Sequence, residues 1–183
     1  MSFHILAEPL PGTYHLSCPS FPDRRGSFSK PFAKPRLEAV FPDFQIAEVF
    51  YSKSVQNVVR GMHFQTPPHA HRKLVHCSHG KVLDVLLDLR LGSPAYGKSV
   101  AIELDGSRSE LLAIPIGVAH GFLTRSEESA LWYFTDVAHA PEHDTGVRWD
   151  SFGHSWPVVD AILSDRDATL PRLQDFTSPF VFP

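Results

Sequence analysis

The stretch Leu74-Val-His-Cys-Ser-His-Gly-Lys-Val-Leu-Asp-Val-Leu-Leu-Asp-Leu89 favours two short β-strands with a tight turn between them. Ser78-His79-Gly80 is typical of a turn that joins antiparallel strands, because Gly tolerates the backbone angles of tight turns. Over residues 81–89, every second position from Leu83 onward is Leu or Val, so one face of the segment is wholly apolar. This alternation has the period of a β-strand.

Similar short apolar segments, each bounded by turn residues, continue on both sides of this stretch. They span residues 44–54, 99–104, 110–114 and 130–136. Closely spaced strands with turns between them favour a sandwich or barrel over a βαβ fold. We therefore predict an all-β, antiparallel β-sandwich, with one short helix over residues 34–40.

The length of 183 residues suits one domain with a substantial core. We expect this domain to span residues 1–183, with an irregular N-terminal arm over about residues 1–20 and a tail over about residues 160–183. The tail is expected to be irregular or weakly helical. Sixteen prolines leave few windows in which a long helix runs unbroken.

Composition and charge exclude several kinds of partner. The net charge is −3 with His neutral, so no basic field points to nucleic acid or to an anionic membrane. The chain shows neither a signal peptide at its start nor an apolar stretch that spans a bilayer, and we expect a cytoplasmic protein. Cys18 and Cys77 lie far apart, which favours free thiols, although one disulfide between them stays open.

A second stretch, Arg60-Gly-Met-His-Phe-Gln65, carries residue types that suit proton transfer at carbon when it is combined with Lys73. His63 can take a proton near neutral pH, and the Lys73 ammonium can stabilise an oxyanion. Tyr133, on another expected strand, can donate a proton from across the substrate, and Asp167 can orient a histidine. Each also has a plain structural interpretation: His63 and Tyr133 as core residues, and Asp167 as a solvated turn acid.

The segment Pro115-Ile-Gly-Val-Ala-His120 resembles the Pro-x-Gly-x-x-His motif of the cupin superfamily. The resemblance implies a cupin-type jelly roll, which is a form of the β-sandwich.

Eleven histidines raise the possibility of a metal site. His69 and His71, with His76 or His120 as a third ligand, would suit a metal-dependent oxygenase or isomerase. However, metal-binding cupins place a Glu shortly after such a His pair, whereas Arg and Lys follow His71 here. A surface loop is the favoured interpretation of His69 and His71, and we expect catalysis to need no metal or other cofactor.

Several motifs, in order, resemble the dTDP-4-dehydrorhamnose 3,5-epimerase family. They are Val59-Arg-Gly-Met-His-Phe-Gln65, Lys73-Leu-Val75, Val82-Leu-Asp-Val-Leu-Leu-Asp-Leu-Arg90, Gly92-Ser-Pro-Ala-Tyr-Gly97, Ile114-Pro-Ile-Gly-Val-Ala-His-Gly-Phe122, Arg148-Trp-Asp150 and Trp156-Pro157. The resemblance runs from Asp23 to Asp167. It implies a metal-free homodimer that inverts C3, C5 or both in a nucleotide-linked 4-keto-6-deoxyhexose. The apolar residues 44–50 are compatible with pairing of two subunits.

The resemblance also implies roles for individual residues. His63 is the general base held by Asp167, Tyr133 is the acid on the opposite face, and Lys73 stabilises the enolate oxygen. The other residues expected to bind substrate are Arg25, Lys30, Glu48, Phe50, Arg60, His120, His139, Asp144 and Arg166. This agrees with the chemistry, because a C4 ketone acidifies the hydrogens at C3 and C5.

Three single residues and one three-residue segment depart from the family's pattern. Lys30 replaces a Glu, Glu48-Val49-Phe50 replaces Gln-Asp-Asn, His139 replaces the aromatic residue that stacks on thymine, and His71 replaces a Gln. All but His71 correspond to the nucleotide end of the family's site. We therefore expect the same chemistry on an altered nucleotide, with CDP- and GDP-linked sugars as candidates beside dTDP. A non-catalytic sugar-nucleotide binder is a further alternative, against which the retained acid and base argue.

Overall fold

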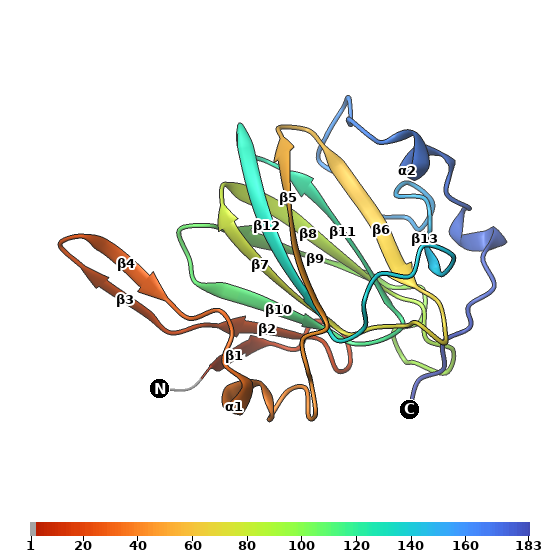
Figure 1. Cartoon of the computed structure of the whole chain (residues 1–183). Helices are drawn as coiled ribbons and strands as arrows, with labels where there is room; N and C mark the ends of the chain where they lie inside the picture. The colour runs from red at the N-terminus through yellow and green to blue at the C-terminus, as the bar shows by residue number, and fades with distance from the viewer. Residues whose placement is uncertain (1–2) are drawn as a thin grey trace.

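The computed structural model describes residues 3–183, which form two facing antiparallel sheets and a separate hairpin (Figure 1). One sheet has the strand order β1-β2-β10-β7-β12-β5, the other has the order β13-β6-β11-β8-β9, and β3 pairs with β4. The strands are β1 (His4–Ala7), β2 (Tyr14–Ser17), β3 (Ser20–Asp23), β4 (Gly26–Ser29), β5 (Glu48–Val55), β6 (Val59–Gln65), β7 (Lys73–His79), β8 (Lys81–Asp88), β9 (Ser99–Asp105), β10 (Glu110–Ile114), β11 (Val118–Thr124), β12 (Glu128–Thr135) and β13 (Asp144–Gly146). The helices are α1 (Lys34–Leu37), α2 (Asp165–Thr169) and a 3₁₀ turn at Leu173–Asp175.

From β5 onward the strands alternate between the sheets, except that β8 and β9 form a hairpin within one sheet: β5, β7, β10 and β12 belong to the six-stranded sheet, and β6, β8, β9, β11 and β13 to the other. This alternation is the connectivity of a jelly roll and confirms the predicted all-β class. The helix expected over residues 34–40 is confirmed but shorter, and the tail carries only α2 and the 3₁₀ turn. No helix among the described residues is long and apolar enough to cross a membrane.

Two expectations about local structure were wrong. The chain changes direction at Gly80 alone, which has φ of +73°, because Ser78 and His79 belong to β7. β7 and β8 lie in different sheets and do not pair. The N-terminal arm is not irregular, because β1 and β2 extend the six-stranded sheet through pairing of β2 with β10. Leu16 on β2 is fully buried, and this burial holds the arm against the sheet.

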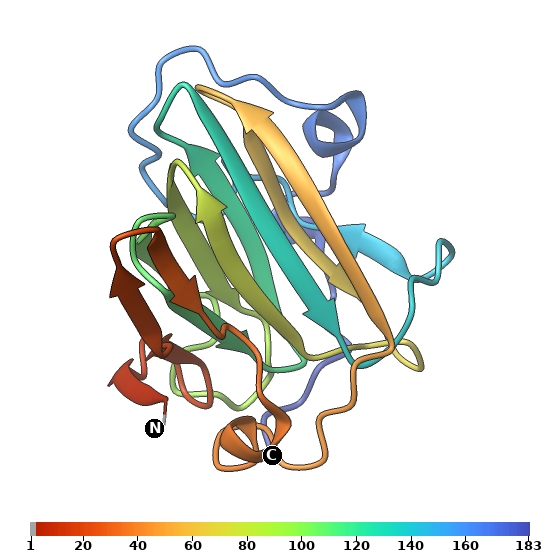
Figure 2. The ribbon, with the colours of Figure 1, turned by 60° about the vertical axis from the view of Figure 1, so that its left-hand side comes forward.

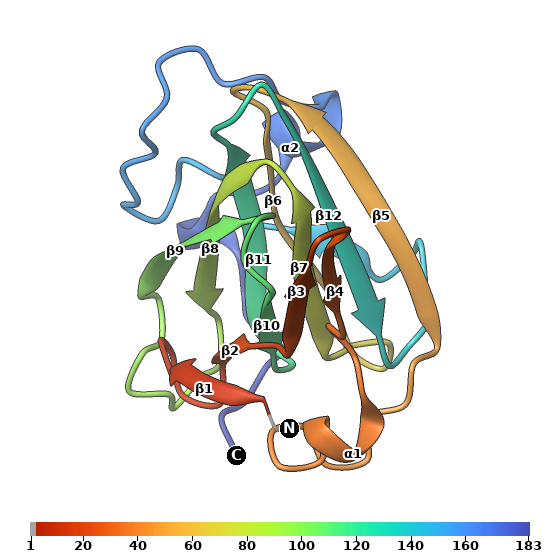
Figure 3. The same cartoon turned by 90° about the vertical axis from the view of Figure 1, so that its left-hand side faces the viewer.

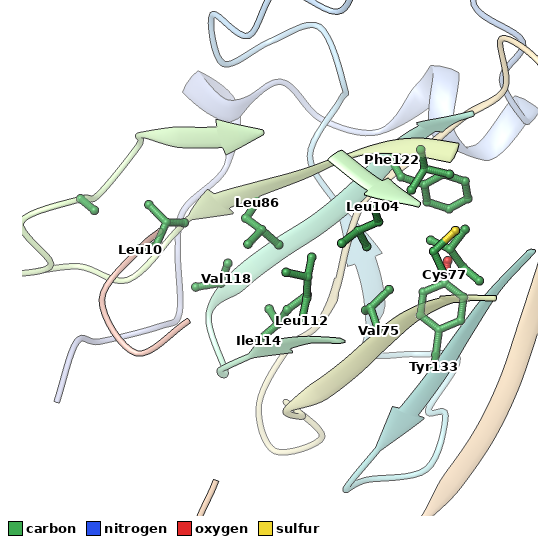
Figure 4. Close-up of a cluster of buried hydrophobic side chains, with 13 residues drawn as sticks. Leu10, Val75, Cys77, Leu86, Leu104, Leu112, Ile114, Val118, Phe122 and Tyr133 are labelled. Carbon is green, nitrogen blue, oxygen red and sulfur yellow. The ribbon is translucent and has the colours of Figure 1, made fainter. Parts of the chain in front are cut away.

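The main core lies between the sheets and includes Val75, Leu86, Leu112 and Phe122 (Figure 4). The wholly apolar face of β8 points the other way, where Val85 and other residues pack under the C-terminal segment. The inner face of β8 therefore carries Asp84, which is fully buried. Cys18 and Cys77 are also buried and are free within the described residues, so the possible disulfide is not formed.

The six-stranded sheet ends at β5, which lies beside β12 at one edge (Figure 2). At the other end of the sheet, α1 covers part of its outer face together with Phe41 and Phe44. The β3–β4 hairpin projects away from both sheets and toward the viewer in Figure 3.

Candidate active site

A cavity of about 370 Å³ lies between the sheets, and residues of β5 and β6 form part of its lining. Side chains from both sheets and from α2 line it. The expected site residues that line the cavity are Glu48, Phe50, Arg60, His63, Lys73, His120, Tyr133, His139, Asp144 and Arg166. Ser52, Gln65, His71 and Thr135 also line it, and none of these was among the expected site residues.

His63 on β6 forms a dyad with Asp167 on α2, with 2.7 Å between His63 Nε2 and Asp167 Oδ1. Asp167 is almost fully buried, which contradicts the interpretation as a solvated turn acid. Its Oδ2 accepts the Gly61 N–H at 3.1 Å, and its own N–H donates to the N-cap residue Ser164. Burial acts to raise the pKa of Asp167, but the hydrogen bond and charge of His63 lower it below its usual value. An ionised Asp167 therefore orients the His63 ring.

Close contact between β6 and β11 places the cavity residues of these strands. Gly61 has φ of +134°, and a Cβ atom there would lie 2.5 Å from the Gly121 Cα. Directly beyond this contact, His63 and His120 pair across the two strands. The two imidazoles therefore enter the same cavity side by side.

Tyr133 reaches the cavity from β12, in the sheet opposite His63. Its side chain is mostly buried, with Ser52 Oγ 3.3 Å from the phenol oxygen. The Phe50 ring stacks on it at a centroid distance of 4.8 Å. Burial raises the pKa of Tyr133 well above its usual value, so the phenol is protonated at neutral pH. The cavity therefore holds a protonated phenol on the sheet opposite the one that carries His63.

Lys73 at the start of β7 is only 8% exposed, and its Nζ donates to the His63 carbonyl at 3.4 Å. Burial lowers the pKa of Lys73 to about 8, against the opposing charges of Asp144 and Asp84. The ammonium form therefore still predominates at neutral pH. Lys73 thus contributes a cation from the six-stranded sheet and reaches β6 of the other sheet through the His63 carbonyl.

His120 on β11 is held by Asp84 on β8, with 2.7 Å between His120 Nε2 and Asp84 Oδ2. Both side chains are buried. Asp84 was missed as a site residue, although an acid in an otherwise apolar strand was a signal, because a buried carboxylate needs a partner.

The other end of the cavity carries two carboxylates. Glu48 Oε2 accepts the backbone N–H of His139 at 2.7 Å, and Asp144 pairs with Arg166 at 2.9 Å. Gln65 holds the neighbouring loop, since its Oε1 accepts the Ala140 N–H at 2.6 Å. This end of the cavity therefore offers hydrogen-bond acceptors beside the ring of His139.

Arg25 and Lys30 lie outside the cavity of their own chain. Arg25 is in the turn of the β3–β4 hairpin and forms an exposed ion pair with Asp23. Lys30 directly follows β4, with its ammonium 5.6 Å from the Phe28 ring centroid. These two residues do not join the other expected residues around the cavity of their own chain, because the hairpin projects away from the sheets (Figure 1).

The histidines considered as metal ligands are not brought together. His71 and His120 line the cavity, but the His69 ring lies tilted against the His143 ring at a centroid distance of 4.6 Å, and both line a separate hollow. The Nδ1 atom of His76 lies 2.8 Å from the Glu110 carbonyl oxygen. Within residues 3–183, no group of three or more His, Cys, Asp or Glu side chains is arranged to hold a metal ion.

A paired base, a buried phenol and a buried ammonium around one cavity define an isomerase of the jelly-roll class that moves protons at carbon. The sequence model of the family described as dTDP-4-dehydrorhamnose 3,5-epimerase matches residues 7–175. The chain belongs to the dTDP-4-dehydrorhamnose 3,5-epimerase family.

Individual relatives agree with this assignment. The chain is 37% identical over 166 residues to the dTDP-4-dehydrorhamnose 3,5-epimerase of Sinorhizobium fredii, covering 88% of this chain and 85% of the relative. The crystal structure of the Bacillus anthracis enzyme, with TDP and PPi bound, superposes with a TM-score of 0.90 at 31% identity, over 94% of this chain and 100% of that one. A 3'-monoepimerase from Streptomyces bikiniensis in complex with dTDP-quinovose gives 0.87 at 28% identity, over 94% and 88%.

Proposed function

We propose that the protein epimerises a nucleotide-linked 4-keto-6-deoxyhexose at C3, at C5 or at both. The observation that carries this proposal is the pairing of the His63–Asp167 dyad on one sheet with Tyr133 on the other, around a cavity that also holds Lys73. Inversion at carbon needs a base and an acid on opposite faces of the substrate. Because a structurally similar protein is a 3'-monoepimerase, the number of inverted centres is left as one or two.

In the first step, His63 removes the proton from the carbon beside the C4 ketone. Asp167 engages Nε2, which leaves Nδ1 to accept the proton, and the carboxylate stabilises the resulting imidazolium. The C–H electron pair moves into the enolate, whose oxygen is stabilised by the Lys73 ammonium. Tyr133 then donates its proton to the same carbon from the other face, and solvent restores both protonation states.

We also propose a homodimer that uses the open edge at β5. Val49, Tyr51 and Val55 on this strand are exposed, with Tyr51 at 55%, and an open apolar edge favours pairing with another chain. Of the residues 44–50 first expected to pair, Phe44 is buried in its own core and is not available. A second copy would also give the projecting hairpin, with Arg25 and Lys30, a cavity to contact.

The expected mass by sedimentation equilibrium at micromolar concentration is twice the 20.4 kDa of one chain. Tyr51→Asp should shift the mass toward the monomer, because it buries a charge at the proposed interface. Exposed Tyr96, far from β5 in sequence, provides the matched control Tyr96→Asp. A wild-type monomer under these conditions contradicts the proposal.

We further propose that the site has a weak or altered base preference. Glu48 presents a carboxylate, which only accepts hydrogen bonds, and the side chain of Phe50 has neither a hydrogen-bond donor nor an acceptor. Thymine offers carbonyl oxygens flanking a single N–H, whereas cytosine and guanine offer amino groups that suit a carboxylate. CDP- and GDP-linked sugars are therefore candidates beside dTDP-linked ones.

Calorimetric affinities for dTDP, UDP, CDP and GDP test this preference. We expect dTDP to bind no more than about tenfold tighter than the best of the others, since a site without matching hydrogen bonds discriminates poorly. Glu48→Gln should weaken CDP and GDP more than dTDP. A preference for dTDP of about a hundredfold or more in the wild type contradicts the proposal.

A further inference from the structure

Asp84 is a fully buried acid whose surroundings are only partly explained by packing. It lies on the inner face of β8, between the apolar residues Val82 and Leu86 of the main core. Its Oδ2 atom is 2.7 Å from His120 Nε2, whereas Oδ1 is buried and has no hydrogen-bond partner in the part of the chain that the structure describes. Burial of a carboxylate with one oxygen lacking a hydrogen bond costs folding free energy, which suggests that Asp84 has a role other than stability.

The partner of Asp84 belongs to the active-site cavity. His120 is only 4% exposed but lines the cavity, and its ring lies edge-on to the Tyr133 ring at a centroid distance of 6.0 Å. Because Asp84 occupies Nε2, the ring is fixed with Nδ1 as its remaining polar atom. Asp84 therefore sets the orientation of a cavity residue, although Asp84 itself does not line the cavity.

Asp84 also acts on the cavity's buried cation. Burial of Lys73 favours its neutral amine, and the negative charges that oppose this effect are those of Asp144 and Asp84. Asp144 is already engaged with Arg166 at 2.9 Å, and this neighbouring cation weakens its effect on Lys73. Burial raises the pKa of Asp84, and the charge and hydrogen bond of His120 and the charge of Lys73 oppose this rise. In its ionised form, the fully buried Asp84 is screened less by solvent than Asp144.

We propose that Asp84 is a positioning residue for the epimerisation, which orients His120 and keeps Lys73 cationic without touching the substrate. The inference rests on the proposed function, because it assigns Asp84 to the cation that stabilises the enolate. Other titratable groups that act on Asp84 or Lys73 are His15 on β2, His71 before β7, Cys77 on β7 and Tyr133 on β12, and His139 after β12 acts on His71. Burial keeps His71, Cys77 and Tyr133 in their neutral forms near neutral pH.

The strand that carries Asp84 also provides a matched control. Asp88 is equally buried on β8, but its carboxylate binds Arg90 at 2.6 Å and Ser93 at 2.7 Å, outside the cavity. Asp88→Asn removes a buried carboxylate from the same strand, and it should reduce thermal stability while leaving the pH dependence of the folded enzyme unchanged.

The test is the pH profile of kcat/KM for Asp84→Asn beside the wild type and Asp88→Asn. Loss of the negative charge should lower the pKa of Lys73 from about 8 by about one unit. The charged fraction at pH 8 then falls from about one half to about one tenth, which is about a fivefold loss, and the difference from wild type narrows as the pH is lowered. A loss that stays constant across pH, or no loss, overturns the proposal.

A second measurement uses the wild-type protein alone and needs neither substrate nor a folded variant. In protein labelled with ¹³C at Asp carboxyl carbons, the Asp84 signal should report an ionised group throughout about pH 6 to 9. A protonated Asp84 in that range overturns the proposal. If the wild type turns over no 4-keto sugar, the proposed function fails, while this titration still decides the charge of Asp84.

Discussion

His63→Ala should abolish exchange of substrate hydrogen with deuterated solvent and, with it, epimerisation. A positioned general base contributes about a hundredfold to ten-thousandfold, so we expect a loss of at least about a hundredfold. His63 is the cavity base that Asp167 orients, with 2.7 Å between Nε2 and Oδ1. NMR of the C3 and C5 protons in deuterated buffer measures exchange and product together.

Tyr133→Phe provides the informative comparison, because it removes only the proton donor. The aromatic ring and its stacking on Phe50 remain, so the cavity should keep its shape. Exchange should therefore persist while the epimerised product falls sharply, since His63 can return deuterium only to the face from which it took the proton. Wild-type exchange in His63→Ala would show that the base has been misassigned.

Lys73→Met should lower kcat by about a hundredfold to a thousandfold, the range found when one oxyanion-stabilising donor is removed. The chain should remain folded, because Met fills a similar volume and replaces a buried charge that is only 8% exposed. Activity and thermal unfolding should be measured together, with the exposed Lys98→Met as control.

The same cation predicts the alkaline limit of the wild-type reaction. The ammonium form is required, and its pKa is lowered by burial to about 8, so kcat/KM should fall as the pH rises through about 8. If Lys73→Met retains wild-type kcat, or if its alkaline limit is unchanged, the enolate is stabilised by another group.

Much of the fold was predictable because strand periodicity is local. The segments expected at residues 99–104 and 110–114 became β9 and β10 with nearly the same bounds. The turn expected at Ser78–Gly80 shows the limit, since similar turn chemistry can join two paired strands or carry the chain from one sheet to the other. Packing between strands that are distant in sequence decides which of these two outcomes occurs, and a short stretch of sequence does not reveal that packing.

The site residues likewise divide into those that the sequence identified and those whose surroundings only the fold reveals. His63, Lys73 and Tyr133 were identified by residue type and motif, and the fold brings them to one cavity. The environment of Asp167 was not predictable, because its burial depends on contact between α2 and the distant Gly61. Asp84 was overlooked, since the local pattern shows only an acid in a strand and not the histidine that faces it from β11.

The most direct measurement is NMR of wild-type protein with dTDP-, CDP- and GDP-linked 4-keto-6-deoxyglucose in deuterated buffer. We predict that solvent deuterium enters at C3, C5 or both, and that the sugar recovered is inverted at a labelled carbon. The C4 ketone should remain, because the reaction transfers protons without oxidation or reduction. Recovery of every sugar with its original configuration and without deuterium would contradict the assignment of this cavity as an epimerase site.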